Sequence, residues 1–320
     1  TEPIESSWYD RNKEYAKNLQ IQAKALLDGS YSEAMIYWIG MKPVTMGYVI
    51  GPIEKYEDKL FFAKTSYQAW VGVMDKKNSE RYDKYKQIIL STRRKVLMSS
   101  EKVNYYDKVQ TRVDDLVLLS GRITRTLPVG VNLPNDFELM EKYGSKISIF
   151  KQTNQIRNLS NKVIFNKLFS PEFRKTFKNA DLEMGSLYST ALHELAHTYL
   201  RYRDSEKRLQ DLFPVIDELA ATVMGIKVCG SLLLKDVATT KQLEAIMVAY
   251  LTRSFLNVLN EKDNPSKQHS VLDGAIFINY LLESGAVKEK DGISWPNFTR
   301  MFVAIDEIAA ILERILSQGT

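Results

Sequence analysis

The stretch His193-Glu194-Leu195-Ala196-His197 lies in the second half of this 320-residue chain and contains two of its 3 histidines. It matches the pattern H-E-x-x-H, in which a helix presents two imidazoles, four residues apart, on one face. Two rings placed in this way can bind a single zinc ion. An ordinary pair of surface histidines is the alternative. The pattern predicts a helix with a metal site on its side.

A second segment offers the further ligand that such a site needs. Zinc in a catalytic site takes three protein ligands and leaves a fourth position for water. Glu218 lies 21 positions after His197, among apolar residues at helical spacing that begin near Pro214. We expect this helix to place the Glu218 carboxylate beside the two imidazoles, and the adjacent Asp217 to orient one of them. A solvated helix face is the alternative for Glu218.

The residue types also suggest a reaction. Glu194 is close enough to the expected ion to accept a proton from water bound there. Zinc lowers the pKa of such a water to about 7, which produces a nucleophile at neutral pH. We therefore predict a hydrolase that holds one zinc ion. Its expected zinc ligands are His193, His197 and Glu218, and its expected general base is Glu194.

The composition gives no sign of a nucleic-acid or membrane partner. Hydrophobic residues make up 44% and charged residues 26% of the chain, which is typical of globular domains. The 44 Lys and Arg are dispersed among 39 Asp and Glu, so the net charge of +5 forms no basic stripe. No apolar run is long enough to span a membrane. We expect a soluble protein, and the residues leave open whether it is cytoplasmic or periplasmic.

Two single features concern the chain's processing and redox state. Cys229, the only cysteine, lies in an apolar run and is expected to be a buried thiol. One cysteine cannot form a disulfide within the chain. The sequence starts at Thr1 rather than at methionine, so we expect that an upstream portion has been removed.

Hydrophobic periodicity divides the chain into a mixed part and a helical part. The predicted helices of the mixed part are 8–28, a shorter one from Ser32, and 78–119, which lacks Gly and Pro. Its predicted extended segments are 44–51, 69–74, 121–131 and 146–150. From about residue 155 the pattern is helical almost throughout. We expect a mainly α fold with a small β-sheet (α+β), in which a mixed α/β part at 1–150 and an all-helical, zinc-bearing part at 151–320 form a cleft.

Several short motifs, in the same order along the chain, resemble those of dipeptidyl peptidase III and its shorter bacterial relatives, a family of zinc metallopeptidases. They are GPIEKYED at 51–58 with AWVGV at 69–73, NLPN at 132–135, HELAH, the Asp217-Glu218 pair, and the segment from His269 through NYLLESGA at 279–286. The long members of that family carry a six-residue H-E-x-x-G-H motif, and this chain has the five-residue form. The resemblance implies a zincin-like, two-lobed metallopeptidase that acts on oligopeptides.

The resemblance also implies residues that contact the substrate. By its own surroundings His269 is a surface-loop residue, whereas the resemblance implies that it hydrogen-bonds the substrate or the developing oxyanion. Asn132 and Asn135 mark a turn by composition, and the resemblance makes them partners of the substrate backbone. Further candidates are Tyr48, Tyr56 and Glu54, whose carboxylate could pair with a peptide's amino terminus or form an ordinary salt bridge.

The sequence leaves three functions open. The first is a zinc-dependent peptidase that releases dipeptides from oligopeptide N-termini. The second is a glutamate-zincin endopeptidase, which would also cut peptides with a blocked amino terminus. The third is a weakly active peptide-binding protein; the intact HELAH and Glu218 argue against it, because an inactive site is free to lose its base.

Overall fold

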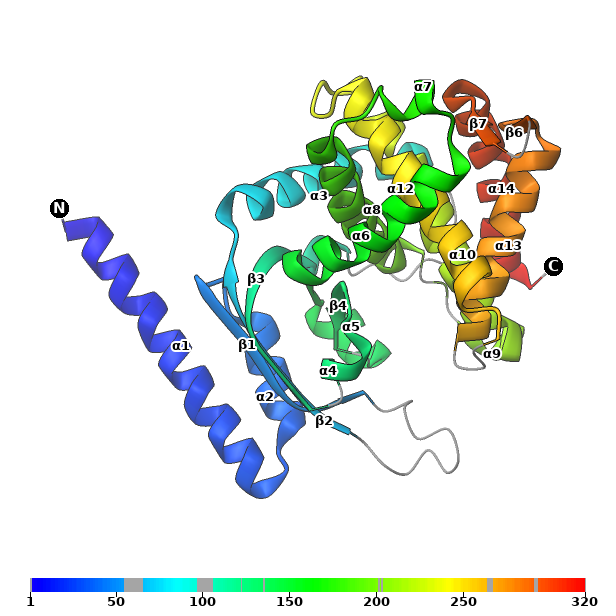
Figure 1. The fold of residues 1–320 in the computed structure, drawn as a ribbon. Coiled ribbons are helices and arrows are strands. Elements are labelled where there is room, and N and C mark those ends of the chain that lie inside the picture. Colours follow the sequence, from blue (N-terminus) through cyan, green and yellow to red (C-terminus); the bar gives the residue numbers. More distant parts are fainter. Residues whose placement is uncertain are drawn as a thin grey trace. The chain divides into compact units, whose positions relative to one another are not determined.

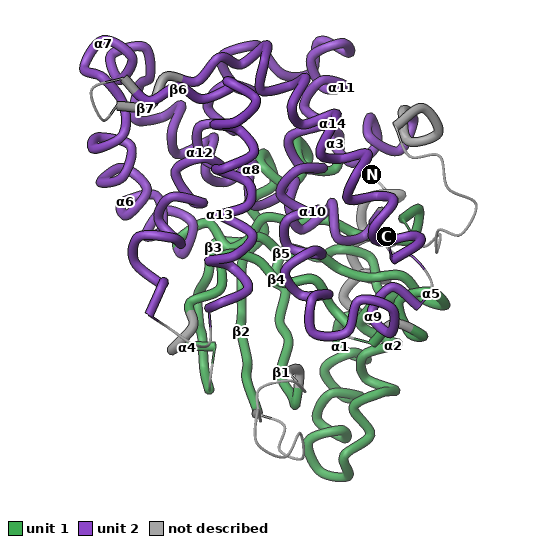
Figure 2. The backbone as a smooth tube through the Cα atoms, turned by 90° about the vertical axis from the view of Figure 1, so that its right-hand side faces the viewer, with its two compact units in different colours: residues 1–83, 105–152 green, residues 84–104, 153–320 purple. Residues whose placement is uncertain are grey.

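The computed structural model describes residues 2–54, 66–96, 106–121, 123–134, 136–200, 202, 204–263, 267–290 and 293–319. Figure 1 draws the fold, and Figure 2 colours its two compact units. Unit 1 comprises residues 1–83 and 105–152, and unit 2 comprises residues 84–104 and 153–320.

Unit 1 is built around the larger sheet. In the described residues, five strands pair in the order β1-β2-β3-β5-β4, and all neighbours are antiparallel except β3 and β5. The strands are β1 (Met46–Glu54), β2 (Ser66–Met74), β3 (Gln110–Gly121), β4 (Gly130–Leu133) and β5 (Lys146–Phe150). The helices are α1 (Glu2–Asp28), α2 (Tyr31–Gly40), α4 (Ile123–Thr126) and α5 (Phe137–Tyr143), with a 3-10 turn at Tyr106–Lys108.

Aromatic and aliphatic side chains from the sheet and α2 form the core of unit 1. Trp70 in β2 and Phe150 in β5 are buried, and their ring centroids lie 5.2 Å apart in an edge-to-face contact. The other buried members of this cluster are Trp38, Ile39, Met41, Val49, Ile123 and Leu133. The core therefore joins residues that are far apart in the sequence.

Strand β3 corrects one prediction. The sequence pattern predicts a helix through residue 119, whereas Gln110–Gly121 forms the middle strand of the sheet. Residues 111–114 are all buried, so this strand lacks the alternation of a half-buried strand. Two of these residues are charged and pair with each other: Arg112 Nε donates to both Asp114 carboxylate oxygens at 2.9 Å. Because Arg112 and Asp114 are charged, the sequence of this buried strand resembles that of a helix with a polar face.

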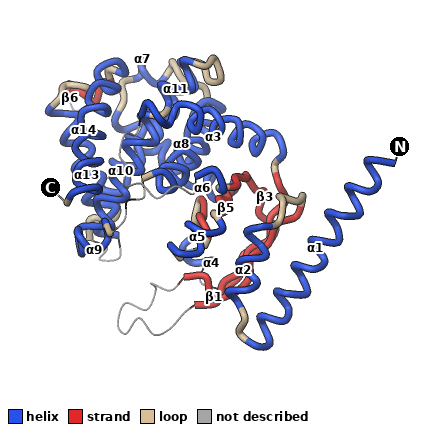
Figure 3. Tube along the Cα trace, turned by 180° about the vertical axis from the view of Figure 1, so that it is seen from behind, coloured by secondary structure: helices blue, strands red, loops and turns tan. Residues whose placement is uncertain are grey.

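Unit 2 is almost entirely helical in its described residues (Figure 3). Its helices are α3 (Lys76–Val96) and α6 (Lys151–Leu168), which both begin in unit 1, then α7 (Pro171–Arg174), α8 (Asn179–Tyr199), α9 (Ser205–Leu209), α10 (Phe213–Lys227), α11 (Cys229–Leu234), α12 (Thr240–Asn260), α13 (Gln268–Glu283) and α14 (Phe298–Gln318), with a 3-10 turn at Gln210–Leu212. A hairpin of β6 (Val287–Lys290) and β7 (Ile293–Pro296) is an element that the sequence pattern does not predict.

Helices α8, α10 and α12 pack closely together in unit 2. Helix α8 packs against α10 and α12, and α10 also packs against α13 and α14. A Cβ at Gly185 would lie 2.4 Å from the backbone oxygen of Ala245, and one at Gly225 would lie 2.1 Å from the Tyr250 hydroxyl. Side chains cannot approach that closely, so glycine at both positions allows α8 and α10 to contact α12.

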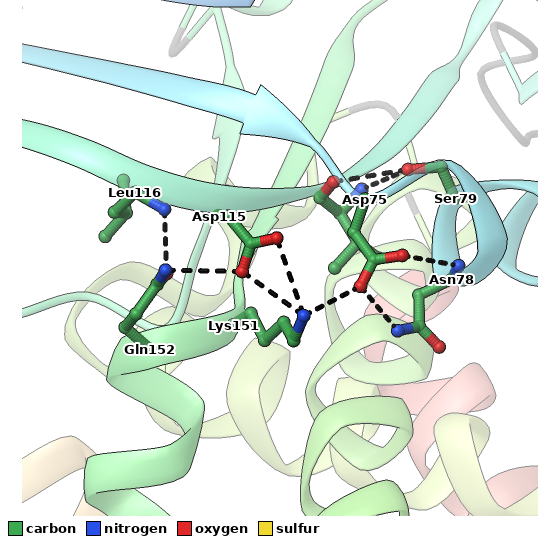
Figure 4. Close-up of polar contacts among 8 residues, drawn as sticks. Asp75, Asn78, Ser79, Asp115, Leu116, Lys151 and Gln152 are labelled. Carbon is green, nitrogen blue, oxygen red and sulfur yellow. Dashed lines mark hydrogen bonds and ion pairs between the residues drawn. The ribbon is translucent and has the colours of Figure 1, made fainter. Parts of the chain in front are cut away.

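Several charged side chains of unit 1 pair with other residues of the same unit (Figure 4). Lys151 Nζ lies 3.0 Å from Asp75 Oδ2 and 3.3 Å from Asp115 Oδ1. Asp75 also accepts hydrogen bonds from the backbone and side-chain amides of Asn78, at 3.1 and 2.8 Å. We call these residues the Lys151 cluster. It fixes the starts of α3 and α6 to the sheet.

The expected α+β class is confirmed, because the fold is mainly helical with a small sheet. Cys229 is a buried free thiol, as predicted. In the part of the chain that the structure describes, no helix combines the length and the apolar character needed to cross a membrane.

Candidate metal centre

Two helices of unit 2 carry the expected ligands. HELAH lies near the end of α8, where His193 and His197 share one face and their ring centroids are 4.8 Å apart. Glu218 lies on α10, whose first turn contains Pro214. Both helices that the sequence predicts around the metal motif are therefore present.

The three expected ligand groups lie close together, with one ligand atom from each within 4.8 Å of the others. His193 Nε2 lies 3.3 Å from His197 Nε2 and 3.2 Å from Glu218 Oε2, and His197 Nε2 lies 3.6 Å from Glu218 Oε1. In a tetrahedral zinc site with bonds of about 2.1 Å, neighbouring ligand atoms are about 3.4 Å apart. The measured separations are close to this value, so the three side chains could hold one zinc ion together.

Two further side chains of α10 contact the Nδ1 atoms of the imidazoles, on the side away from the expected metal. Asp217 Oδ2 lies 3.1 Å from His197 Nδ1, and Thr222 Oγ1 lies 3.3 Å from His193 Nδ1. These contacts leave each Nε2 directed toward the ligand point, which is the usual arrangement around ligand histidines. The sequence predicts Asp217 but misses Thr222, although its place four residues after Glu218 puts it on the same helix face.

The two histidines have opposite electrostatic surroundings. Burial, aided by the charge of Arg253, lowers the pKa of His193 to about 4. Burial would also lower the pKa of His197, but the surrounding carboxylates, foremost Asp217, outweigh it and raise the pKa to about 9. At neutral pH, His193 is therefore ready to bind a metal, whereas His197 must first release a proton.

The carboxylates of the centre also differ. Burial raises the pKa of Glu194, and the charge of His197 opposes this. Burial acts in the same direction on Glu218, but its hydrogen bond and charge contacts with His193 hold the pKa of that carboxyl well below its usual range. Glu194 forms no hydrogen bond or ion pair with a described residue. It is thus available to accept a proton at the centre.

The sequence patterns do not predict two arginines that lie near the metal centre. Arg157 of α6 and Arg253 of α12 both interact electrostatically with Glu194 and Glu218. Each arginine comes from a different helix, and neither has a fixed spacing to HELAH. Only the packing of α6 and α12 around α8 brings them together with the expected ligands.

His269 lies on a helix that also borders the centre. It is the second residue of α13, is half-buried, and precedes Asp273 by one turn. Burial, then the charge of Glu218, raises the pKa of Asp273 to about 7. Because Asp273 lies within electrostatic range of Glu218, His269 shares the side of α13 that borders the centre. Its contact with substrate stays a prediction.

The other predicted substrate residues belong to unit 1. Tyr48 is on β1 and Asn132 on β4, the two outer strands of the sheet. Tyr48 Oη and Asn132 Oδ1 are buried without a hydrogen-bond partner in the described residues, and burial raises the pKa of Tyr48. Glu54 is the last residue of β1. Its side chain lies outside the described part of the chain, as do Tyr56 and Asn135, so all these roles stay predictions.

The fold and the ligand atoms first define a broad class: a mainly helical protein with a candidate His-His-Glu metal centre. Two solved structures narrow this class. The chain resembles DPP III from Caldithrix abyssi with a TM-score of 0.82 and 25% identity, over 95% of this chain and 59% of that one. It resembles dipeptidyl-peptidase III from Corallococcus sp. strain EGB with a TM-score of 0.80 and 19% identity, over 96% of this chain and 58% of that one. The chain has a dipeptidyl peptidase III-like fold, which confirms the resemblance seen in the sequence.

A curated protein also matches in sequence. The chain is 23% identical to Nudix hydrolase 3 of Arabidopsis thaliana over 321 residues, which cover 95% of this chain and 40% of that protein. No family model matches the chain. It spans between 40% and 59% of the length of these three proteins.

Proposed function

We propose that this chain is a zinc-dependent peptidase that releases dipeptides from the amino termini of oligopeptides. The observation that carries the proposal is the spacing of 3.2 to 3.6 Å between ligand atoms of His193, His197 and Glu218. The likeness to two structures that bear the name dipeptidyl peptidase III supports a peptide substrate and a dipeptide product.

The chain's own residues divide the work. His193, His197 and Glu218 would hold the zinc, which when bound supplies a Lewis acid that activates water and polarises a carbonyl group. Glu194 accepts the proton of the attacking water and then donates it to the leaving amine. Asp217 and Thr222 keep the two imidazoles in place through their Nδ1 atoms.

Substrate positioning is assigned to the remaining predicted residues. His269 would donate a hydrogen bond to the carbonyl oxygen as negative charge develops on it. The amides of Asn132 and Asn135 would pair with the backbone of an extended peptide, and Tyr48, Glu54 and Tyr56 would bind near its amino terminus. The likeness to the two dipeptidyl peptidase III structures supports these assignments.

Mass spectrometry of the products tests the cleavage pattern. An oligopeptide library and its N-acetylated counterpart are digested with zinc present and with zinc chelated. We expect dipeptides from free N-termini alone, and only with zinc. Cleavage of the acetylated peptides would favour the endopeptidase alternative, and no cleavage of either library would favour the weakly active peptide-binding protein.

The variant Glu194→Gln tests the general base. We expect the hydrolysis rate to fall by about 10²- to 10⁴-fold while zinc content, measured by elemental analysis, stays at one ion per chain. Glu183→Gln is the matched control, because Glu183 is an exposed acid on the same helix. A Glu194→Gln protein that keeps the full rate would remove Glu194 from this role.

A further inference from the structure

Two half-buried arginines of unit 2 have no hydrogen-bond or ion-pair partner among the residues that the structure describes. Arg157 Nη1 is buried without a hydrogen bond, and both Arg157 and Arg253 lack an ion pair or hydrogen bond with any described residue. Burial, then the charge of Arg253, lowers the pKa of Arg157 to about 9. An unpaired buried charge is costly, so a protein that retains two of them together usually has a use for them.

Contacts between helices place both arginines beside the metal centre. The hydroxyl of Thr190 on α8 donates to Asn154 Oδ1 on α6 at 2.8 Å. Arg157 lies three residues after Asn154, and Glu194 lies four residues after Thr190. This contact places α6 against α8 next to the HELAH segment, and the charges of Glu194 and Glu218 act on Arg157.

Helix α12 brings the second arginine to the same place. A Cβ at Gly225 would lie 2.1 Å from the Tyr250 hydroxyl and 3.4 Å from the backbone nitrogen of His193. Tyr250 thus reaches the start of the HELAH segment. Arg253 follows it by three residues on α12, and its charge acts on His193, Glu194 and Glu218.

One of the acids near these arginines has another role in the proposed function. Glu218 is a ligand in the proposed function, and a bound divalent cation would take up its negative charge. Asp273, a further acid within electrostatic range of Arg253, accepts a hydrogen bond from the backbone of Gly274 at 2.6 Å. With Glu218 bound to the metal, Glu194 and Asp273 are the acids that remain in electrostatic range of Arg253, and neither forms an ion pair with it among the described residues.

Arg112, a buried arginine in unit 1, serves as a comparison because its role is purely structural. Arg112 donates to Asp114 through Nε at 2.9 Å, and to the backbone oxygen of Val44 at 3.1 Å. Its guanidinium is satisfied within the chain. Arg157 and Arg253 differ because no described residue accepts a hydrogen bond from their donors.

We propose that Arg157 and Arg253 form a carboxylate-binding subsite beside the metal centre, and that this subsite selects peptides carrying a carboxylate near the scissile bond. The inference rests on the proposed function, since it takes the ligand to be a peptide. A guanidinium group binds a carboxylate through two parallel N–H donors, which matches this ligand in shape and charge. The carboxylate comes either from the C-terminus of a short peptide or from an acidic side chain.

Calorimetry with the zinc-loaded Glu194→Gln protein tests the subsite without turnover. The probes are tetra-alanine, its C-terminal amide, and the amides of Ala-Ala-Glu-Ala and Ala-Ala-Gln-Ala. We expect about 10- to 100-fold tighter binding of the carboxylate-bearing member of at least one pair. The acid and amide of tetra-alanine report on the terminus, and the Glu and Gln peptides report on a side chain. Equal affinities within both pairs overturn the proposal.

Variants then assign the effect to the arginines. Arg253→Met and Arg157→Met should each reduce the preference for the carboxylate, and Arg314→Met, at an exposed arginine of α14, should leave it unchanged. Folded variants that weaken acid and amide equally overturn the assignment. If a methionine variant fails to fold, Arg253→Lys or Arg157→Lys keeps the charge but loses the two-donor geometry, and should retain only part of the preference. Zinc content is measured separately, so failure of the zinc site is not mistaken for failure of the subsite.

Discussion

The Lys151 cluster of unit 1 and the metal centre of unit 2 both gather charged side chains from several elements, but they differ in what satisfies those charges. In the Lys151 cluster, one ammonium group lies between the carboxylates of Asp75 and Asp115 (Figure 4). In the metal centre, three ligand atoms converge, and two nearby guanidinium groups form no hydrogen bond or ion pair with a described residue. Charges that satisfy one another stabilise a fold, whereas charges left unsatisfied mark where a ligand is expected.

Arg112→Met is the largest expected change and concerns folding alone. The substitution leaves the carboxylate of Asp114 buried without its partner, which costs about 3–5 kcal/mol of unfolding free energy. Urea unfolding measures this loss, and zinc affinity should not change because the metal ligands lie in unit 2. Replacing both residues, as Arg112→Met with Asp114→Leu, should restore much of the stability. A single variant as stable as the parent would contradict the comparison.

Glu218→Ala should remove the metal centre while leaving the fold. Loss of a direct ligand is expected to weaken zinc binding by roughly more than 100-fold, because loss of an outer partner alone costs 10- to 100-fold. Competition with a chelator measures the affinity. Glu206→Ala, at an exposed acid on α9, serves as the control. Zinc retained at parental affinity would exclude Glu218 as a ligand.

Asp217→Asn tests whether the contact of Asp217 with His197 Nδ1 supports zinc binding. The amide keeps the size of the side chain but loses the charge that lies 3.1 Å from His197 Nδ1. We expect zinc affinity to fall by about 10- to 100-fold, and Thr222→Val to act in the same direction through His193. If both variants bind zinc as the parent does, the contacts behind the imidazoles have no bearing on the metal.

The pH dependence of zinc binding should reveal the protonated histidine. The pKa of His197 is raised to about 9, so zinc must displace a proton, and its affinity should rise about tenfold per pH unit toward pH 9. The folding stability of the metal-free protein changes in the opposite direction with pH. A raised folded-state pKa adds stability that is complete below the unfolded value, about 6.5, and is lost as pH rises through 9. Calorimetry in buffers of different ionisation enthalpy counts the proton, and no proton release at pH 7 would refute this.

Lys151→Met should have the smallest effect. The cluster is partly exposed, and such ion pairs contribute about 1 kcal/mol or less to the free energy of unfolding. Urea unfolding, compared with the exposed control Lys76→Met, measures it. An effect as large as that of Arg112→Met would show that the cluster contributes more to folding than its exposure indicates.

The sequence predicts the parts of the centre that depend on spacing within one helix. Four residues separate His193 from His197, and Glu218 follows Pro214 by four, so helix geometry alone orders these side chains. The α+β class also follows from periodicity. Arg157 and Arg253 could not be predicted, because their place beside HELAH depends on how α6 and α12 pack on α8. Strand β3 was hidden for a related reason: Arg112 and Asp114 are polar in the sequence but satisfied by each other in the sheet.

Helix α10 supplies Asp217, Glu218 and Thr222, so all the contacts that this helix makes with the two imidazoles share one rotational setting. Each residue of an α-helix advances the side chains by about 100° around the axis. Deleting a single residue within the first turn of α10, before Asp217, would therefore rotate all three side chains away together. The geometry of the metal centre therefore depends on the rotational position of α10 about its axis. Insertions or deletions upstream of α10 are tolerated only where the connection from α8 can absorb them.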